Sequence, residues 1–141
     1  MSHGVKVCDI SSDVKQALEK FRFRKDKTNA ALIMKVDREK QLICVDELLE
    51  DVSVDELRET LPEHQPRYVV FSYKMEHGDG RISYPMSFIY ITPRDSQIEL
   101  QIMYAGTKMA LQKEAGLTRT YEIRELEEFT EEWLKEKLSR T

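Results

Sequence analysis

Residues 96–116 read Ser-Gln-Ile-Glu-Leu-Gln-Ile-Met-Tyr-Ala-Gly-Thr-Lys-Met-Ala-Leu-Gln-Lys-Glu-Ala-Gly. The apolar residues of this stretch recur at helical spacing and no proline interrupts them, which predicts a long helix running to about Glu114. Ser96 and Glu99 fit a capping box at its start, and Gly116 fits the glycine that commonly follows a helix. A helix of this kind needs another layer of structure to cover its apolar side.

The predicted helix carries two apolar faces. One face holds Leu100, Met103, Tyr104, Thr107 and Leu111, and roughly opposite lie Ile98, Ile102, Gly106 and Met109. A helix in a layered domain normally needs a single apolar stripe. Two interpretations follow: either the helix is wedged between a sheet and another helix, or its second stripe meets a partner. We expect Ile102 and Met109 to face a partner, because methionine adapts well to binding surfaces.

Outward from this helix, helices and strands alternate along the chain. From the N-terminus, the predicted elements are a helix from residues 11–13, strands at 30–36 and 41–45, a helix from 53 to Pro62, strands at 67–74 and 82–91, the long helix, a strand at 120–123 and a helix after Thr130. Ser53 and Glu56 form a capping box, and Pro85 predicts a bulge or a pairing gap in its strand. This order predicts an α/β (α+β) domain with helices on the faces of a sheet. We expect one domain, 1–141, with a folded core at about 5–138.

The charge is small overall but unevenly distributed. Lys plus Arg total 22 and Asp plus Glu total 26, which gives −4 and argues against general nucleic-acid binding. Residues 15–40 hold nine basic and four acidic side chains, whereas residues 46–63 hold eight acidic and one basic. Such zoning suits the steering of a protein partner, although it is also typical of solvated faces.

Nothing in the sequence favours an enzyme, a metal site or a cofactor. The histidines His3, His64 and His77 are scattered, without the spacing of a zinc site. Cys8 and Cys44 stand in no CxxC motif and are expected to be reduced thiols. The start of the chain has no apolar signal stretch, and no run is long enough to span a bilayer. These features predict a cytoplasmic protein.

Several motifs carry a resemblance to a known family. The long helix contains QIMYAGTK (101–108), similar to the core of the long helix of cofilin and actin-depolymerising factor. The set QIMYAGTK, FRFRK (21–25) with TNAALIMKVD (28–37), LPEHQPRYVVFSYK (61–74), DGRISYPMSFIY (79–90) and TEEWLKEKL (130–138) resembles the glia maturation factor family of the actin-depolymerising-factor homology fold. The resemblance implies a cofilin-like single domain with a mixed central sheet of five to six strands flanked by helices.

The resemblance also implies a partner. Glia maturation factors bind the actin-related protein 2/3 complex, dissociate the branches of actin networks and restrain new branching. Related actin binders place lysines in the first turns of the long helix, where this chain has Glu99 and Gln101. An acid at that position weakens a contact with acidic actin, so we expect weak or no direct actin binding by a monomeric chain.

Two partner surfaces are carried over from the resemblance. The first comprises the arm Ser2, His3, Gly4 and Val5 with Glu99, Gln101, Ile102, Gly106 and Met109. The second comprises Arg22, Arg24 and Lys25 with Glu131, Glu132 and Lys135. Ser2 is a candidate phosphorylation site, since a phosphate there repels an acidic groove. The alternatives are a cofilin-like filament-severing protein and a signalling or kinase-regulating factor.

Overall fold

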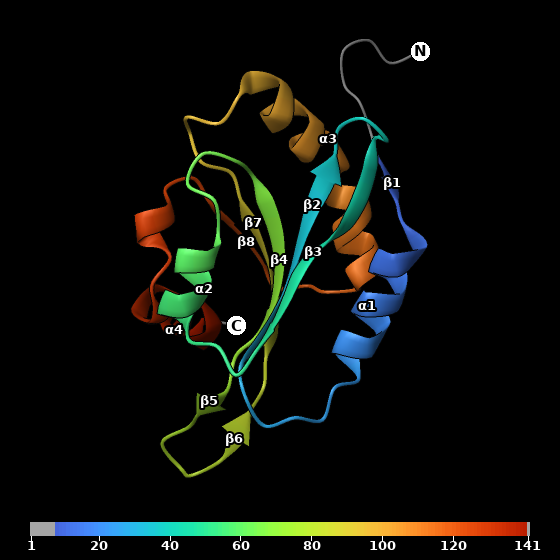
Figure 1. Ribbon diagram of the computed structural model, residues 1–141. Helices are drawn as coiled ribbons and strands as arrows, with labels where there is room; N and C mark the ends of the chain where they lie inside the picture. The colour runs from blue at the N-terminus through green and yellow to red at the C-terminus, as the bar shows by residue number, and fades with distance from the viewer. Residues whose placement is uncertain (1–7, 141) are drawn as a thin grey trace.

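A six-stranded mixed sheet forms the middle layer of the molecule (Figure 1). The computed structural model describes residues 8–140. In spatial order the strands are β1 (Asp9–Ile10), β3 (Leu42–Glu50), β2 (Ala30–Asp37), β4 (Arg67–Ser72), β7 (Met86–Ile91) and β8 (Thr120–Ile123). The four inner strands pair antiparallel, while β1 pairs with β3 and β8 with β7 in parallel. This arrangement confirms the predicted mixed central sheet.

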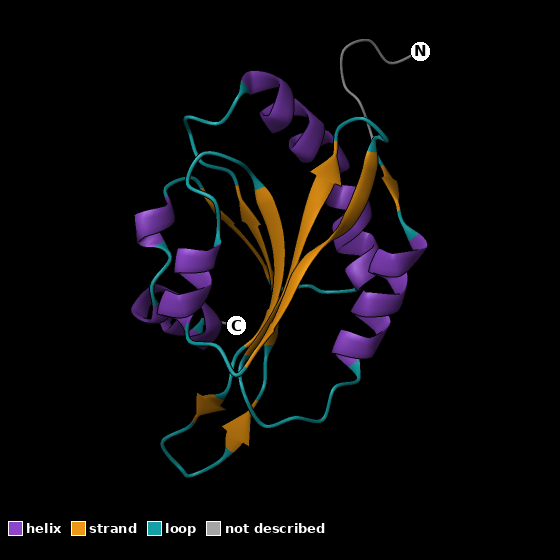
Figure 2. Cartoon of the chain, viewed as in Figure 1, coloured by secondary structure: helices purple, strands orange, loops and turns teal. Residues whose placement is uncertain are grey.

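Helices cover both faces of the sheet, as Figure 2 shows. Helices α1 (Ser12–Arg22) and α3 (Ile98–Ala115) pack on one face. On the other face lie α2 (Val54–Thr60) and α4 (Glu131–Ser139), with the short 3₁₀ turn η1 (Leu126–Glu128) before α4. Two hydrophobic clusters result, one on each side of the sheet. The strands between them are buried on both faces, which explains the nearly continuous apolar runs in β2, β4 and β7.

The first hairpin is longer than its sequence pattern predicts. Strand β3 was expected to end at residue 45 but continues to Glu50, opposite Ala30 of β2. The extension was missed because Asp and Glu are depleted in strands, and because the register shifts at Ile33/Met34. In the turn, Asp37 Oδ1 accepts hydrogen bonds of 3.1 Å from the amides of Glu39 and Lys40.

The predicted strand at 82–91 is divided in two, as Pro85 indicated. Its first part, β6 (Ile82–Ser83), pairs with β5 (Met75–Glu76) in a separate two-stranded ribbon at one end of the molecule (Figure 1). The second part is β7. Between them the amide of Tyr73 donates to the carbonyl oxygen of Pro85 at 3.1 Å, so the chain stays close to β4 across the break.

Most helix ends follow their predicted caps. Ser11 accepts from the amide of Val14 at 3.1 Å, and Ser53 and Glu56 form the reciprocal capping box of α2. Thr130 caps α4 in the same way as Ser11 caps α1, and Gly116 ends α3 with a positive φ of 69°. None of the helices between residues 8 and 140 is both long enough and apolar enough to cross a membrane.

The predicted capping box at Ser96 and Glu99 is wrong. The N-cap of α3 is Gln97, which makes no side-chain cap, and Glu99 instead binds Arg38 in the β2–β3 turn. The amide group of Gln101 supports this end of the helix by donating to the carbonyl oxygen of Ser96 at 2.7 Å. The Ser96 hydroxyl, which the capping box required as an acceptor, is instead buried without a hydrogen-bond partner among the described residues.

Candidate functional site

Helix α3 has one buried face and one bare apolar face. Its inner residues Leu100, Met103, Tyr104, Thr107 and Leu111 are buried against the sheet. On the outer face the exposed fractions are 73% for Ile98, 45% for Ile102 and 66% for Met109. The interpretation in which both faces are buried is therefore wrong. We call the outer residues Ile98, Ile102, Gly106 and Met109 the α3 stripe.

Buried hydrogen bonds hold α3 in place beneath the stripe. The Tyr104 hydroxyl accepts from the amide of Val36 at 2.9 Å, and the Tyr68 hydroxyl donates to the carbonyl oxygen of Tyr104 at 2.5 Å. The hydroxyl of Thr107 accepts from the amide of Cys8 at 3.0 Å. Burial raises the pKa of both Tyr68 and Tyr104. These bonds join one turn of α3 to several segments of the chain, so the stripe sits on a rigid support.

Charged side chains flank the stripe on the side of β7 and β8. Lys108 lies 4.0 Å from the carboxylate of Glu122 and 5.7 Å from the ring centre of Tyr90. A shallow groove of about 320 Å³ opens there, lined in part by Ile98, Ile102 and Arg124. An apolar stripe with a mixed-charge margin is the usual composition of a protein-binding surface.

The two residues at the start of α3 are both engaged within the molecule. Glu99 accepts from the guanidinium of Arg38, which also donates to Gln97 Oε1 at 3.4 Å. Gln101 donates to the carbonyl oxygens of Ser96 and Arg94. The acid at position 99 is thus paired with a cation from the β2–β3 turn. Sequence reasoning missed Arg38, because nothing in its local pattern places it beside a helix that begins sixty residues later.

The rest of the first predicted surface cannot be placed in the same way. Ser2, His3, Gly4 and Val5 lie outside the described residues. The position of the arm beside the stripe, and the phosphorylation of Ser2, therefore stay predictions.

The second predicted surface is spread over two faces of the molecule. Arg22, Arg24 and Lys25 lie at the end of α1, whereas Glu131, Glu132 and Lys135 lie on α4, across the sheet (Figure 1). The segment 27–29, which follows the three basic residues, borders a groove that Glu131 and Lys135 also line. Glu131 also accepts from the Tyr73 hydroxyl at 2.6 Å, and burial together with this contact raises the pKa of Tyr73.

Arg24 differs from its basic neighbours. Its side chain is only 8% exposed and donates to the carbonyl oxygen of Thr28 at 3.0 Å. It also lies 3.6 Å from Glu50 at the end of β3. Arg22 and Lys25 are exposed. Arg24 therefore fastens the loop after α1 and offers little charge to a partner.

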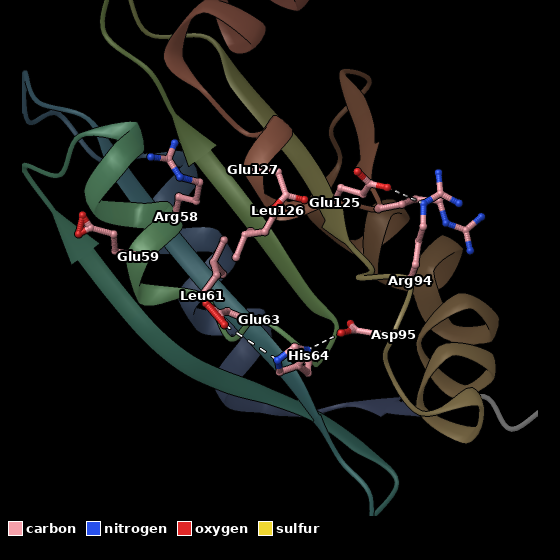
Figure 3. A pocket seen from close by; sticks show the side chains of 11 residues that line it. Arg58, Glu59, Leu61, Glu63, His64, Arg94, Asp95, Glu125, Leu126 and Glu127 are labelled. Atoms are coloured by element: carbon pink, nitrogen blue, oxygen red, sulfur yellow. Dashed lines mark hydrogen bonds and ion pairs between the residues drawn. The ribbon is translucent and has the colours of Figure 1, made fainter.

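A polar pocket of about 570 Å³ is lined by the end of α2, the loop after it and the segments around Arg94 and Glu125 (Figure 3). His64 Nδ1 stands 2.5 Å from Asp95 Oδ2, and Arg94 donates to Glu125 at 3.1 Å. Arg58 donates to the carbonyl oxygen of Phe129 at 2.7 Å and so joins α2 to the segment before α4. The contacts His64–Asp95 and Arg94–Glu125 each link two separate loops beside the pocket, which is typical of loop anchoring. Within the described part of the chain, no three His, Cys, Asp or Glu side chains are grouped to hold a metal ion.

The fold and the bare long helix match a known family. Residues 7–139 fit the family model of the cofilin/tropomyosin-type actin-binding proteins. Glia maturation factor of Drosophila melanogaster is 69% identical over 132 residues, covering 94% of this chain and 96% of that protein. The chain belongs to the glia maturation factor family.

Two further glia maturation factors are similar to this chain in sequence or in structure. Glia maturation factor beta of Homo sapiens is 53% identical over 138 residues, which cover 98% of this chain and 97% of that protein. The solution structure of glia maturation factor from Caenorhabditis elegans superposes with a TM-score of 0.81 at 41% identity, covering 96% of this chain and 99% of that one. Glia maturation factors and their wider cofilin-type family are binding proteins and not enzymes, in agreement with the sequence prediction.

Proposed function

We propose that this chain binds the actin-related protein 2/3 complex, promotes the debranching of actin filament networks and inhibits branched nucleation. The observation that carries the proposal is the α3 stripe, three large apolar side chains exposed on a helix that the core holds rigidly. Exposed apolar residues in such a row mark an interaction site. The identity of the partner is the one implied by the resemblance of the sequence motifs to glia maturation factors.

The start of α3 supports this partner over actin itself. Related actin binders carry lysines where this chain has Glu99 and Gln101, and the pairing of Glu99 with Arg38 leaves no net positive charge on these two residues and Arg38 together. A surface without excess cations is poorly suited to an acidic actin groove. The proposed place of action is the cytoplasmic actin cortex and lamellipodia, and the chain acts as a monomer.

A cofilin-like function is the second candidate, because the matching family model describes actin-binding proteins. Two measurements separate the candidates. In a pull-down from cell extract, we expect the wild-type chain to retain the branch-nucleating complex, and in co-sedimentation we expect it to stay in the supernatant of pure filaments. Strong co-sedimentation with pure filaments and no retention of the complex would instead establish the cofilin-like function.

A matched pair of variants tests the surface. Met109→Ala removes an exposed side chain of the stripe, and Ile82→Ala removes an apolar side chain exposed to a similar degree on the distant β5–β6 ribbon. Retention of the complex should fall with the first and persist with the second. Equal retention by both variants would refute the role of the stripe.

A further inference from the structure

The outer edge of β3 is open along most of its length. Strand β1 pairs with β3 only at Leu42 and Ile43, after which the chain turns away into α1. From Cys44 to Glu50 no strand within residues 8–140 pairs with this edge. An open edge presents backbone donors and acceptors that can accept an added strand.

An apolar groove runs beside the open edge. It lies between α1 and β3 and has a volume of about 350 Å³. Its apolar lining residues are Ala17, Phe21, Leu32, Val45 and Leu48, and its polar margin consists of Asp13, Gln16, Lys20, Arg24 and Glu50. Leu48 is 52% exposed and points to the same side of the sheet as the buried Leu32. The groove can therefore hold apolar side chains of a segment that pairs with the open backbone of β3.

Charge along the edge indicates what kind of strand fits. Asp46 pairs with Arg67 at 3.0 Å and Glu50 lies near Arg24, but Glu47 and Asp51 form no ion pair with any described residue. Glu47 stands opposite Ile33, which belongs to the cluster under α2, whereas Leu48 stands opposite Leu32, in the cluster under α1. The edge thus presents an apolar contact surface at Leu48 on one face of the sheet and the unpaired carboxylate of Glu47 on the other.

We propose that the β3 edge, Cys44–Glu50, binds an extended segment of a partner protein with alternating apolar and basic side chains. Successive side chains of a strand point to opposite faces of a sheet. The apolar set enters the groove beside Leu48 and the basic set lies beside Glu47. The backbone of the bound segment forms hydrogen bonds with β3 and so continues the pairing that β1 makes at Leu42 and Ile43. This surface is separate from the α3 stripe.

The test uses a synthetic capped peptide that alternates valine and lysine and is long enough to pair with Cys44–Glu50. Its matched control has the same sequence with N-methyl groups on alternate amides, which removes strand hydrogen bonds and keeps charge and composition. Amide resonances of the ¹⁵N-labelled full chain are followed during titration. We expect saturable shifts confined to β3, the end of β1 and α1, and no such shifts with the methylated peptide.

Protein variants complete the experiment. Leu48→Thr should weaken peptide binding roughly fivefold to tenfold, because it removes the apolar contact surface, whereas Ile82→Thr on the β5–β6 ribbon should leave it unchanged. Glu47→Gln should weaken binding and reduce its salt dependence. Equal binding of the methylated peptide, shifts outside the β3 edge, or no shifts at all would overturn the proposal. So would concentration-dependent β3 shifts without peptide, which would assign the edge to a second copy of the chain.

Discussion

Leu111 and Met109 lie two positions apart on α3 and differ completely in environment. Leu111 is fully buried and Met109 is 66% exposed. Leu111→Ala should therefore lower the free energy of unfolding by ~2–5 kcal/mol, and Met109→Ala should change it by less than ~0.5 kcal/mol. Urea unfolding followed by circular dichroism measures both. A loss for Met109→Ala as large as that for Leu111→Ala would mean that the helix faces are reversed.

Glu99 and Gln101 occupy the positions where related actin binders have lysines. Changing both to lysine should raise affinity for monomeric actin and lower affinity for the branch complex, because specificity depends on repulsive as well as attractive elements. Titration of the double variant against each partner provides the measurement. The gain in actin affinity should be partial, because binding energy concentrates in a few buried anchors.

Arg38 supplies the control for this experiment. In the double variant, the lysine that replaces Glu99 would lie beside Arg38, and the two positive charges would repel each other. Adding Arg38→Gln to the double variant should remove this repulsion between exposed charges, which is worth about 0.5 kcal/mol. Arg38→Gln alone should leave stability nearly unchanged. If the double lysine variant gained no actin binding and kept full binding to the branch complex, charge at the start of α3 would not separate the two functions.

At the scale of elements, the end of α1 divides into a structural cation and exposed ones. Arg24→Ala should lower stability, because it removes the hydrogen bonds to Thr28 and the contact with Glu50. Arg22→Ala with Lys25→Ala should leave stability unchanged and, if these exposed cations meet an acidic partner, slow association and flatten its salt dependence. Stopped-flow measurement of association with the branch complex, for the wild-type chain and the Arg22/Lys25 double variant at low and moderate salt, tests this. Identical kinetics in both forms would leave Arg22 and Lys25 as solvated surface residues.

Elements with strong local signals could be predicted from the sequence. The two faces of α3, the capping box at Ser53 and the break at Pro85 all depend on neighbours within a few residues, and all are present. The extension of β3 and the short β1 could not be predicted, because pairing with distant strands and not propensity stabilises them.

The candidate site was predictable in part for the same reason. Helical spacing predicts two apolar faces on α3 but does not tell which of them is exposed, and the partner role of the exposed face stays a proposal. The pairing of Glu99 with Arg38 and the burial of Arg24 depend on the path of distant loops. The false capping box at Ser96 shows the limit of a local motif, because Arg38, from a distant turn, binds the Glu99 carboxylate that the box required.

At the scale of the whole molecule, buried tyrosines link stability to alkaline pH. Burial raises the pKa of Tyr68, Tyr90 and Tyr104, whereas in the unfolded chain a tyrosine ionises near pH 10. The folded state therefore holds more protons above that pH, and the free energy of unfolding should fall by up to about 1.4 kcal/mol per pH unit for each of these tyrosines.

Denaturant unfolding between about pH 8 and pH 11 measures the effect. Tyr68→Phe lowers stability at every pH but should make the decline less steep, because one titrating group is gone. A stability that stays constant through this range would contradict the assignment of these tyrosines to the core.

The parallel pairs at the two ends of the sheet join strands that lie far apart in the sequence, and this separation bears on the order of folding. The hairpin of β2 and β3 closes over a short turn, whereas β8 reaches β7 only after α3 has crossed the sheet between them. Contacts that close long segments form late, because their loop entropy must be overcome first. Helix α3 is anchored at both ends only when β8 is in place. We therefore expect the α3 stripe of a newly synthesised chain to reach its fixed orientation late in folding, once β8 has paired with β7.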